Sequence, residues 1–154
     1  MSNHAISVLA VDDEESFLTV LQNILTEEGF GVVTAADGVE AINALQARTF
    51  DLCLLDVRMP RVDGIEVLKY IKVHFLDMPV IMVTRVGEVR IAVECMKLGA
   101  FHYLTKPYSA VDLQAVVDLA LERRRLVLEN KVLKSELASA AGRVQVGAAV
   151  SMSD

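Results

Sequence analysis

The sequence has no tryptophan, only three prolines and two cysteines among its 154 residues, and no excess of positive charge. Neither Cys53 nor Cys95 has a second cysteine or a histidine at the spacing of a metal site, and two isolated cysteines do not support a disulfide framework. Both lie in apolar runs, so we expect buried thiols in a reducing cytoplasm. The formal net charge of -6 argues against direct binding of this segment to nucleic acid or to an anionic membrane.

Long apolar runs are also absent. None approaches the roughly 18 residues that a membrane-spanning helix needs, and the N-terminus lacks a basic segment followed by an apolar one. We therefore expect neither a signal peptide nor a membrane anchor. Hydrophobic residues still make up 53% of the chain, which excludes intrinsic disorder for most of it and allows a substantial core.

Short β-rich runs alternate five times with segments of helical periodicity. The predicted strands are residues 5–11, 31–35, 51–55, 79–84 and 101–105. The predicted helices are residues 14–28, 38–47, 64–74 and 88–98, and a last one that starts near residue 109. This alternation predicts a doubly wound α/β fold, in which helices cover both faces of one parallel sheet.

The last predicted helix is unusually long, because no glycine or proline occurs from Ser109 to Ala141. Two sets of residues recur there every seven positions, Leu119, Leu126 and Leu133 in one set and Val116, Arg123, Asn130 and Leu137 in the other. Asparagine or arginine in such a seam favours two strands over larger assemblies. The pattern predicts an extended C-terminal helix that forms a dimeric coiled coil.

An alternative is that these residues pack on the domain's own sheet. That alternative suits Val116 and Leu119. It suits the later leucines poorly, since a rise of about 1.5 Å per residue carries Leu126, Leu133 and Leu137 roughly 10–27 Å beyond Leu119.

Polar residues follow four predicted strands at their carboxyl ends: Asp12 and Asp13, Asp56, Thr84 and Lys106. These strand ends meet at one edge of a doubly wound sheet, where ligands bind. Three neighbouring carboxylates need a divalent cation or raised pKa values, and a set of oxygen ligands favours Mg²⁺. A carboxylate beside Mg²⁺ can attack phosphorus, and the lysine and the threonine can stabilise the product. No GxxxxGK[ST] motif is present, which argues against a P-loop nucleotide site.

With these residues, the chain resembles the receiver domain of two-component response regulators over about residues 5–122. The matching positions are Asp12-Asp13, the string DVRMPRVDG from Asp56 to Gly64, Thr84, and Lys106-Pro107. The resemblance implies a flavodoxin-like (βα)5 fold with sheet order 2-1-3-4-5 and a cis peptide before Pro107. It also implies a signalling domain rather than an enzyme, with slow self-dephosphorylation and self-phosphorylation from small donors.

The resemblance further implies roles for single residues. Asp56 would accept a phosphoryl group from a sensor histidine kinase. Asp13 and Asp56 would bind Mg²⁺ directly, Asp12 would act largely through water, and the backbone carbonyl of Arg58 would be a third protein ligand.

Three more positions bear on the predicted switch. Thr84 and Lys106 would contact the phosphoryl group, and Tyr103 matches an aromatic residue whose ring moves inward when Thr84 closes on the phosphate. Arg85 departs from the family, which usually has a small residue there, and could shield the site, steer anionic donors or pair with the phosphoryl group.

Residues 119–137 resemble the linker between the receiver and the ATPase in sigma-54-dependent transcriptional activators, and residues 146–152 are similar to the start of that AAA+ domain. We therefore expect a receiver domain over residues 1–122, a coiled-coil linker over 123–138, and a flexible tail over 139–154 that holds the truncated start of an AAA+ domain. In this interpretation, phosphorylation changes a homodimer interface and thereby controls downstream AAA+ and DNA-binding domains of the same chain.

Other interpretations stay open at this point. The chain could be a complete single-domain regulator, or a constitutive dimerisation module with a silent phosphorylation site. A phosphatase-like hydrolase also uses an aspartate nucleophile and Mg²⁺, but it calls for an Asp-x-Asp motif, and position 58 is an arginine.

Overall fold

The computed structural model describes residues 5–148, with side chains described as far as residue 141. Strands and helices alternate strictly along the chain. The strands are β1 (Ser7–Val11), β2 (Gly31–Ala35), β3 (Leu52–Asp56), β4 (Val80–Arg85) and β5 (His102–Lys106). The helices are α1 (Glu15–Glu27), α2 (Gly38–Ala47), α3 (Gly64–His74), α4 (Val89–Lys97) and α5 (Ala110–Ala148).

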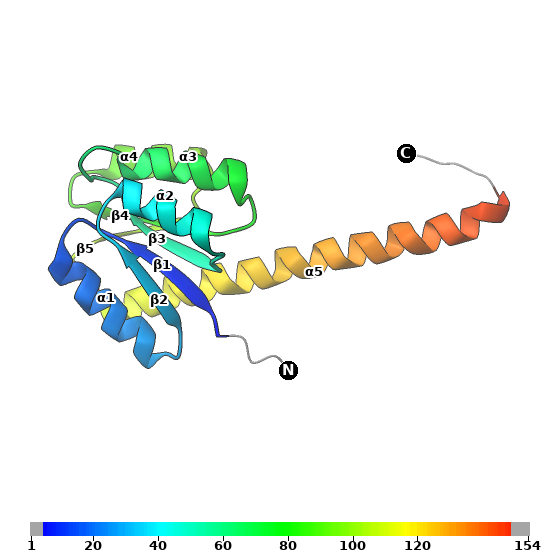
Figure 1. The fold of residues 1–154 in the computed structure, drawn as a ribbon, viewed down its shortest axis with the longest axis horizontal. Coiled ribbons are helices and arrows are strands. Elements are labelled where there is room, and N and C mark those ends of the chain that lie inside the picture. The colour runs from blue at the N-terminus through cyan, green and yellow to red at the C-terminus, as the bar shows by residue number, and fades with distance from the viewer. Residues whose placement is uncertain (1–4, 149–154) are drawn as a thin grey trace. The chain divides into compact units, whose positions relative to one another are not determined.

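All five strands form one parallel sheet, with the order β2-β1-β3-β4-β5. This confirms the predicted doubly wound fold and its 2-1-3-4-5 order. Figure 1 shows the central sheet with helices on either side of it. The order reverses between β1 and β3, so the carboxyl ends of these two central strands flank the place where such sheets bind ligands.

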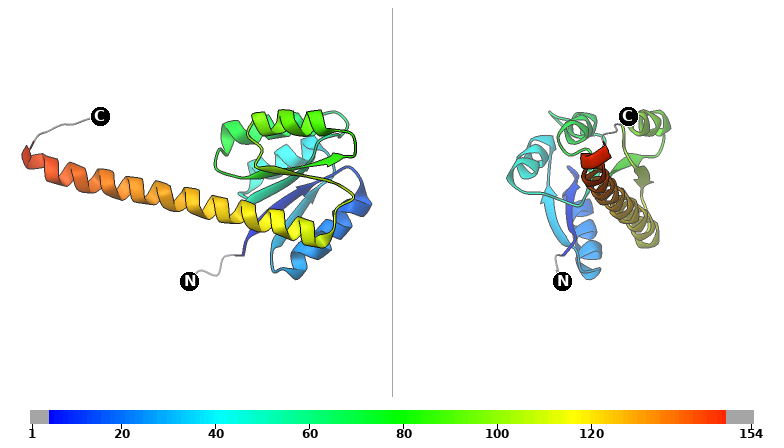
Figure 2. Two further views of the ribbon diagram at one scale, coloured as in Figure 1. Left: turned by 180° about the vertical axis from the view of Figure 1, so that it is seen from behind. Right: turned by 90° about the vertical axis from the view of Figure 1, so that its right-hand side faces the viewer.

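Alternate residues of the central strands enter two separate cores, because successive side chains of a strand point to opposite faces. On one face, Leu9 and Leu55 pack with residues of α2, α3 and α4. On the other face, Val8 and Leu54 pack with residues of α1 and the start of α5. The views in Figure 2 show these two helical layers around the sheet. Burial on both faces explains the continuous apolar runs of the central strands.

Local signals fix the ends of the helices that lie near the strand ends. Asp37 and Asp63 are the N-caps of α2 and α3, and their side chains accept hydrogen bonds from backbone amides three residues later, at 2.8 and 3.1 Å. The peptide between Lys106 and Pro107 is cis, as the resemblance predicts. Cys53 and Cys95 are free and buried, as expected.

Helix α5 belongs to two compact units, with the boundary after Arg124. In the first unit, Leu113, Val117 and Ala120 of α5 are buried against the sheet together with Val116. Val116 is only 8% exposed, so its side chain is part of the domain core and not of the predicted dimer seam. Leu119 is 56% exposed, so it does not pack on the sheet as the alternative interpretation suggested.

In the second unit, the described side chains lie on a single helix. Leu126, Leu133 and Leu137 are all exposed, and so is Asn130. The helix continues to Ala148, whereas the sequence predicts a flexible tail from residue 139; residues 149–154 lie outside the described residues. Within the described part of the chain, no helix is long and apolar enough to cross a membrane.

Candidate functional site

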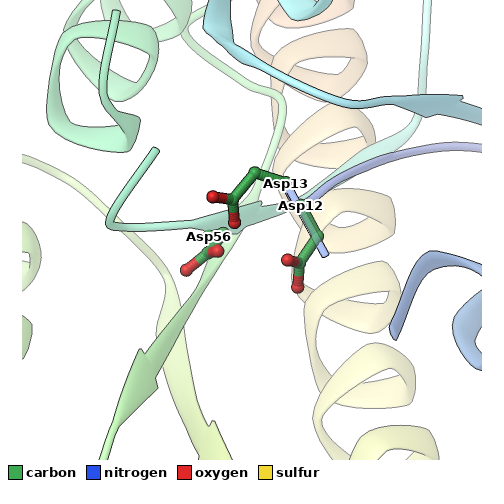
Figure 3. A group of neighbouring side chains, drawn as sticks. All are labelled: Asp12, Asp13 and Asp56. Atoms are coloured by element: carbon green, nitrogen blue, oxygen red, sulfur yellow. The ribbon is translucent and has the colours of Figure 1, made fainter. Parts of the chain in front are cut away.

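The predicted polar residues do come together at the carboxyl edge of the sheet. Asp12 and Asp13 follow β1 directly, Asp56 ends β3, and Lys106 ends β5. One carboxylate oxygen from each of the three aspartates lies within 4.8 Å of the others. Figure 3 shows the three side chains converging above the ends of their strands. The parallel order of the sheet therefore places these residues in one cluster, although Asp13 and Asp56 are separated by 42 residues along the chain.

Asp56 lies at the bottom of this cluster and is 1% exposed. Its Oδ1 accepts a long hydrogen bond of 3.4 Å from the backbone amide of Arg58. Its Oδ2 is buried, has no hydrogen-bond partner among the described residues, and lies 3.7 Å from Nζ of Lys106. Burial, followed by the charge of the Asp12 carboxylate, raises the pKa of Asp56 to about 7. A cation beside these carboxylates would remove the repulsion between them.

Lys106 is buried, with 6% of its surface exposed, and its ammonium has several partners. Nζ lies 2.8 Å from Oδ2 of Asp12, 2.6 Å from Oε1 of Glu14, and 4.1 Å from the centre of the Phe17 ring. Burial alone would lower the pKa of Lys106, but the hydrogen bonds to the two carboxylates raise it above its usual value. Lys106 therefore stays charged in the resting structure and is closer to Asp12 and Glu14 than to Asp56.

The hydroxyl of Thr84 is directed toward β5 in this structure. Its Oγ1 lies 3.4 Å from the backbone oxygen of Leu104 and 3.3 Å from Oγ1 of Thr105, so both contacts are long. Tyr103, on β5 itself, is 36% exposed and is not among the residues of the buried core. The hydroxyl of Thr84 is thus held only by long contacts to β5, and Tyr103 lies on that strand at the surface.

A rim of charged side chains surrounds the entrance to the site. Arg58 and Arg85 line one cavity of about 320 Å³ together with Asp13. Glu88 joins the loop that carries Arg58 to the end of β4, because its carboxylate accepts from Nε of Arg58 at 2.7 Å and from the backbone amide of Arg85 at 2.9 Å. These bonds hold the pKa of Glu88 below its usual value although burial acts the other way.

Sequence reasoning missed two residues of this site, Glu14 and Glu88. Glu14 follows the acidic pair directly, and its hydrogen bond from Lys106 lowers the pKa of its carboxyl. Glu88 lies three residues after Arg85, a spacing at which a side chain can accept from a backbone amide. Glu14 could have been predicted as a site residue from its position in the sequence, since it directly follows Asp12 and Asp13.

The donor set fits a hard divalent cation. Among the described residues, Asp12, Asp13 and Asp56 are the group of three potential ligands that lie close enough to share one ion. Both oxygens of Asp12 are engaged, one by Lys106 and the other by the backbone amide of Glu14 at 2.9 Å. Asp13 is exposed, and Oδ1 of Asp56 accepts only a long hydrogen bond, so these two residues are the better placed direct ligands.

Comparison with known proteins gives consistent matches. The family model described as "Response regulator receiver domain" matches residues 8–118. The alkaline phosphatase synthesis transcriptional regulatory protein PhoP of Bacillus subtilis is 39% identical over 129 residues, which are 84% of this chain and 54% of that protein. The transcriptional regulatory protein ZraR of Escherichia coli is 41% identical over 121 residues, which are 79% of this chain and 27% of that protein.

Among solved structures, NtrX from Brucella abortus matches with a TM-score of 0.81 and 33% identity. The match covers 84% of this chain and 30% of that one. The chain thus spans about half or less of the length of these relatives.

Proposed function

The chain belongs to the response regulator receiver family, and from this premise we propose that Asp56 accepts a phosphoryl group from a sensor histidine kinase. The observation that carries the proposal is the buried Oδ2 of Asp56, which has no hydrogen-bond partner among the described residues and faces Lys106 at 3.7 Å. Oδ2 attacks phosphorus, the bond between phosphorus and the donor's histidine nitrogen breaks, and the nitrogen keeps its electron pair. The product is an acyl phosphate on Asp56.

Mg²⁺ fits this site, held by Asp13, Asp56 and the backbone carbonyl of Arg58, with Asp12 acting through water. Bound there, it supplies positive charge that offsets the carboxylates and the entering phosphoryl oxygens. Asp12 keeps a second role, because its contact with Lys106 holds that ammonium at the edge of the site. The exposed Asp13 and the weakly bonded Oδ1 of Asp56 support this division of roles, and Oδ2 of Asp56 remains the nucleophile.

The remaining residues respond to the new charge, about -2 at neutral pH. Lys106 neutralises part of it, and the hydroxyl of Thr84 leaves its long contacts on β5 to donate to a phosphoryl oxygen. Tyr103, which is 36% exposed on β5, then moves inward. A local change of charge thereby becomes a change of the surface formed by α4, β5 and α5.

The output we propose is a change in a homodimer that controls downstream AAA+ and DNA-binding domains of a longer chain, and so sigma-54-dependent transcription, in the cytoplasm. The support is the resemblance of the linker and the row of exposed side chains along the later part of α5. That row consists of Leu119, Arg123, Leu126, Asn130, Leu133 and Leu137, all exposed. Without Val116, the proposed seam begins at Leu119. We keep the receiver at residues 1–122, the coiled-coil linker at 123–138 and the tail at 139–154 as proposed boundaries.

The test is the intact mass of the chain after incubation with Mg²⁺ and acetyl phosphate, followed over time. We expect one added phosphoryl group that is lost slowly, and no adduct on Asp56→Asn, which keeps the shape of the side chain but removes the nucleophile. Asp118→Asn, on the exposed face of α5, is the matched control and should behave as wild type. Equal uptake by Asp56→Asn would show that another residue is the acceptor. No uptake by the wild type would favour a constitutive dimerisation module.

A further inference from the structure

The ammonium of Lys106 makes its shortest contact with a residue that has no role in the proposed phosphorylation. Nζ is 2.6 Å from Oε1 of Glu14, against 3.7 Å from Oδ2 of Asp56. The same Glu14 oxygen lies 3.7 Å from a guanidinium nitrogen of Arg85. One carboxylate oxygen thus faces both cations that border the phosphoacceptor on this side.

The position of Glu14 in the fold does not by itself call for this side chain. Glu14 is the N-cap of α1, where serine, threonine, aspartate or asparagine is preferred because a short side chain can accept from the first turn. Its own side chain makes no such capping bond. Its backbone is fixed instead by the hydrogen bond from its amide to Oδ1 of Asp12, at 2.9 Å. The long side chain is thereby free to reach Lys106.

We propose that Glu14 is a positioning residue that holds Lys106 and Arg85 away from Asp56 until a phosphoryl group arrives, and then releases both. This inference rests on the proposed phosphorylation of Asp56. Arg85 lines the same cavity as Asp13, so on release its guanidinium is beside the phosphoryl group and adds a contact to those of Thr84 and Lys106.

The difference in burial between Glu14 and Asp12 determines which of the two carboxylates loses its contact with Lys106. The side chain of Glu14 is 42% exposed, whereas that of Asp12 is only 2% exposed. A carboxylate that leaves a cation and turns into water loses little, whereas a buried carboxylate without its cation is costly. The phosphoryl group is the stronger acceptor, because it carries about two charges and three oxygens. The exchange therefore occurs at Glu14, while Asp12 keeps its contact with Lys106.

Three variants separate the effect of the length of the Glu14 side chain from the effect of its charge. Glu14→Gln keeps the length of the side chain and removes the charge. Glu14→Asp keeps the charge, improves the residue type at the helix cap, and is too short to hold Lys106 in the same way. Glu15→Gln is the matched control, because it removes the same charge one residue later, where no contact with Lys106 is made.

Two measurements are made on the full chain. In the resting protein, ¹⁵N NMR follows proton exchange of the Lys106 ammonium, and we expect faster exchange in Glu14→Gln and Glu14→Asp but not in Glu15→Gln. With Mg²⁺ and acetyl phosphate, intact mass gives the phosphorylated fraction at steady state. We expect the ratio of phosphorylated to free chain to rise about 1.5- to fivefold in both Glu14 variants, the range of a single ion pair whose carboxylate is exposed to water. The gain should shrink when Arg85→Ala is added.

The outcomes are distinct. A wild-type chain that takes up no phosphoryl group refutes the proposed function and, with it, the role of Glu14. A wild-type chain that is phosphorylated, with both Glu14 variants unchanged in ammonium exchange and in phosphorylated fraction, refutes only the role of Glu14. A gain in Glu14→Gln and Glu15→Gln alike, but not in Glu14→Asp, shows that charge alone acts and also overturns the proposal.

Discussion

Gly64 is the first residue of α3, and a single methyl group there should disturb both the fold and the site. A Cβ on Gly64 would lie 2.1 Å from the backbone oxygen of Asp56 and 2.8 Å from Cα of Val57. Both atoms are backbone, so no flexible side chain can move aside. The amide of Gly64 also donates to the backbone oxygen of Val57 at 2.8 Å, which fixes the approach of the two segments. Gly64→Ala must therefore push α3 away from the end of β3.

The size of the effect follows from comparing two opposing terms. Alanine is favoured over glycine in a helix by up to about 1 kcal/mol, and the φ of Gly64 is not positive, so conformation alone would make the variant more stable. Overpacking against fixed atoms costs about 1–3 kcal/mol or more, and here both close contacts are shorter than atoms tolerate. Because the clashing atoms are backbone, the cost lies at the upper end of this range, and we expect a net loss of about 2 kcal/mol or more in the free energy of unfolding. Such a loss lowers the Tm by about 4–8 °C or more for a chain of this size.

The assay is thermal and urea unfolding of wild type, Gly64→Ala and a control, Gly31→Ala. Gly31 lies at the start of β2, and a Cβ there would meet only the backbone oxygen of Ile6 at 3.8 Å, an ordinary contact. Gly64→Ala should also weaken Mg²⁺ binding, measured by titration of the folded protein, because Arg58 lies in the loop that joins Asp56 at the end of β3 to the displaced α3. A Gly64→Ala variant as stable as Gly31→Ala, with unchanged Mg²⁺ affinity, would refute the reasoning.

Two further predictions concern α5. Asn130→Leu should tighten self-association by about tenfold or more and weaken the preference for a dimer, because it replaces a polar residue of the proposed seam with an apolar one. Sedimentation should show this change for Asn130→Leu but not for Lys131→Leu, which lies beside the seam. An Asn130→Leu variant that stays monomeric like the wild type would contradict the coiled coil. Arg124→Gln should lower the free energy of unfolding by about 1 kcal/mol in urea, because the partly buried Arg124 contacts Asp51 at 3.0 Å. Arg125→Gln, at an exposed position of the same helix, should lower it by only about 0.3 kcal/mol. Equal losses in the two variants would contradict the argument.

The architecture was predictable because each element carries its own local signal. The three central strands are apolar runs that are buried on both faces, and the predicted helix over residues 38–47 has the observed bounds, since Asp37 caps its start. The differences lie at the ends of elements. The third strand was predicted over 51–55 and is observed over Leu52–Asp56. Asp56 belongs to it because its backbone pairs with Val83 of the neighbouring strand, which no local pattern reveals.

The residues that end the strands were predictable as members of the site, whereas Glu14, Glu88 and the contacts within the site were not. Once the strands are parallel, the residues that end them must share an edge, which brings Asp12, Asp56 and Lys106 together. The carboxylate that lies nearest to the ammonium of Lys106 depends on side-chain torsions and on burial. The sequence placed Lys106 beside Asp56, and the structure places its ammonium nearer to Glu14.

The seven-residue pattern of α5 shows where a sequence signal becomes ambiguous. Val116 and Leu119 both belong to it, yet one is buried and the other exposed. Leu113, Val116, Val117 and Ala120 form an i, i+3, i+4, i+7 stripe that faces the sheet, and Leu119 lies outside this stripe. One helix therefore carries both a buried stripe and a row of exposed residues. Val116 fits the spacing of both, although it is buried. The exposed positions start at Leu119 in the first unit, and the exposed leucines of the second unit continue the same seven-residue spacing in the sequence, so only burial separates the two patterns at Val116.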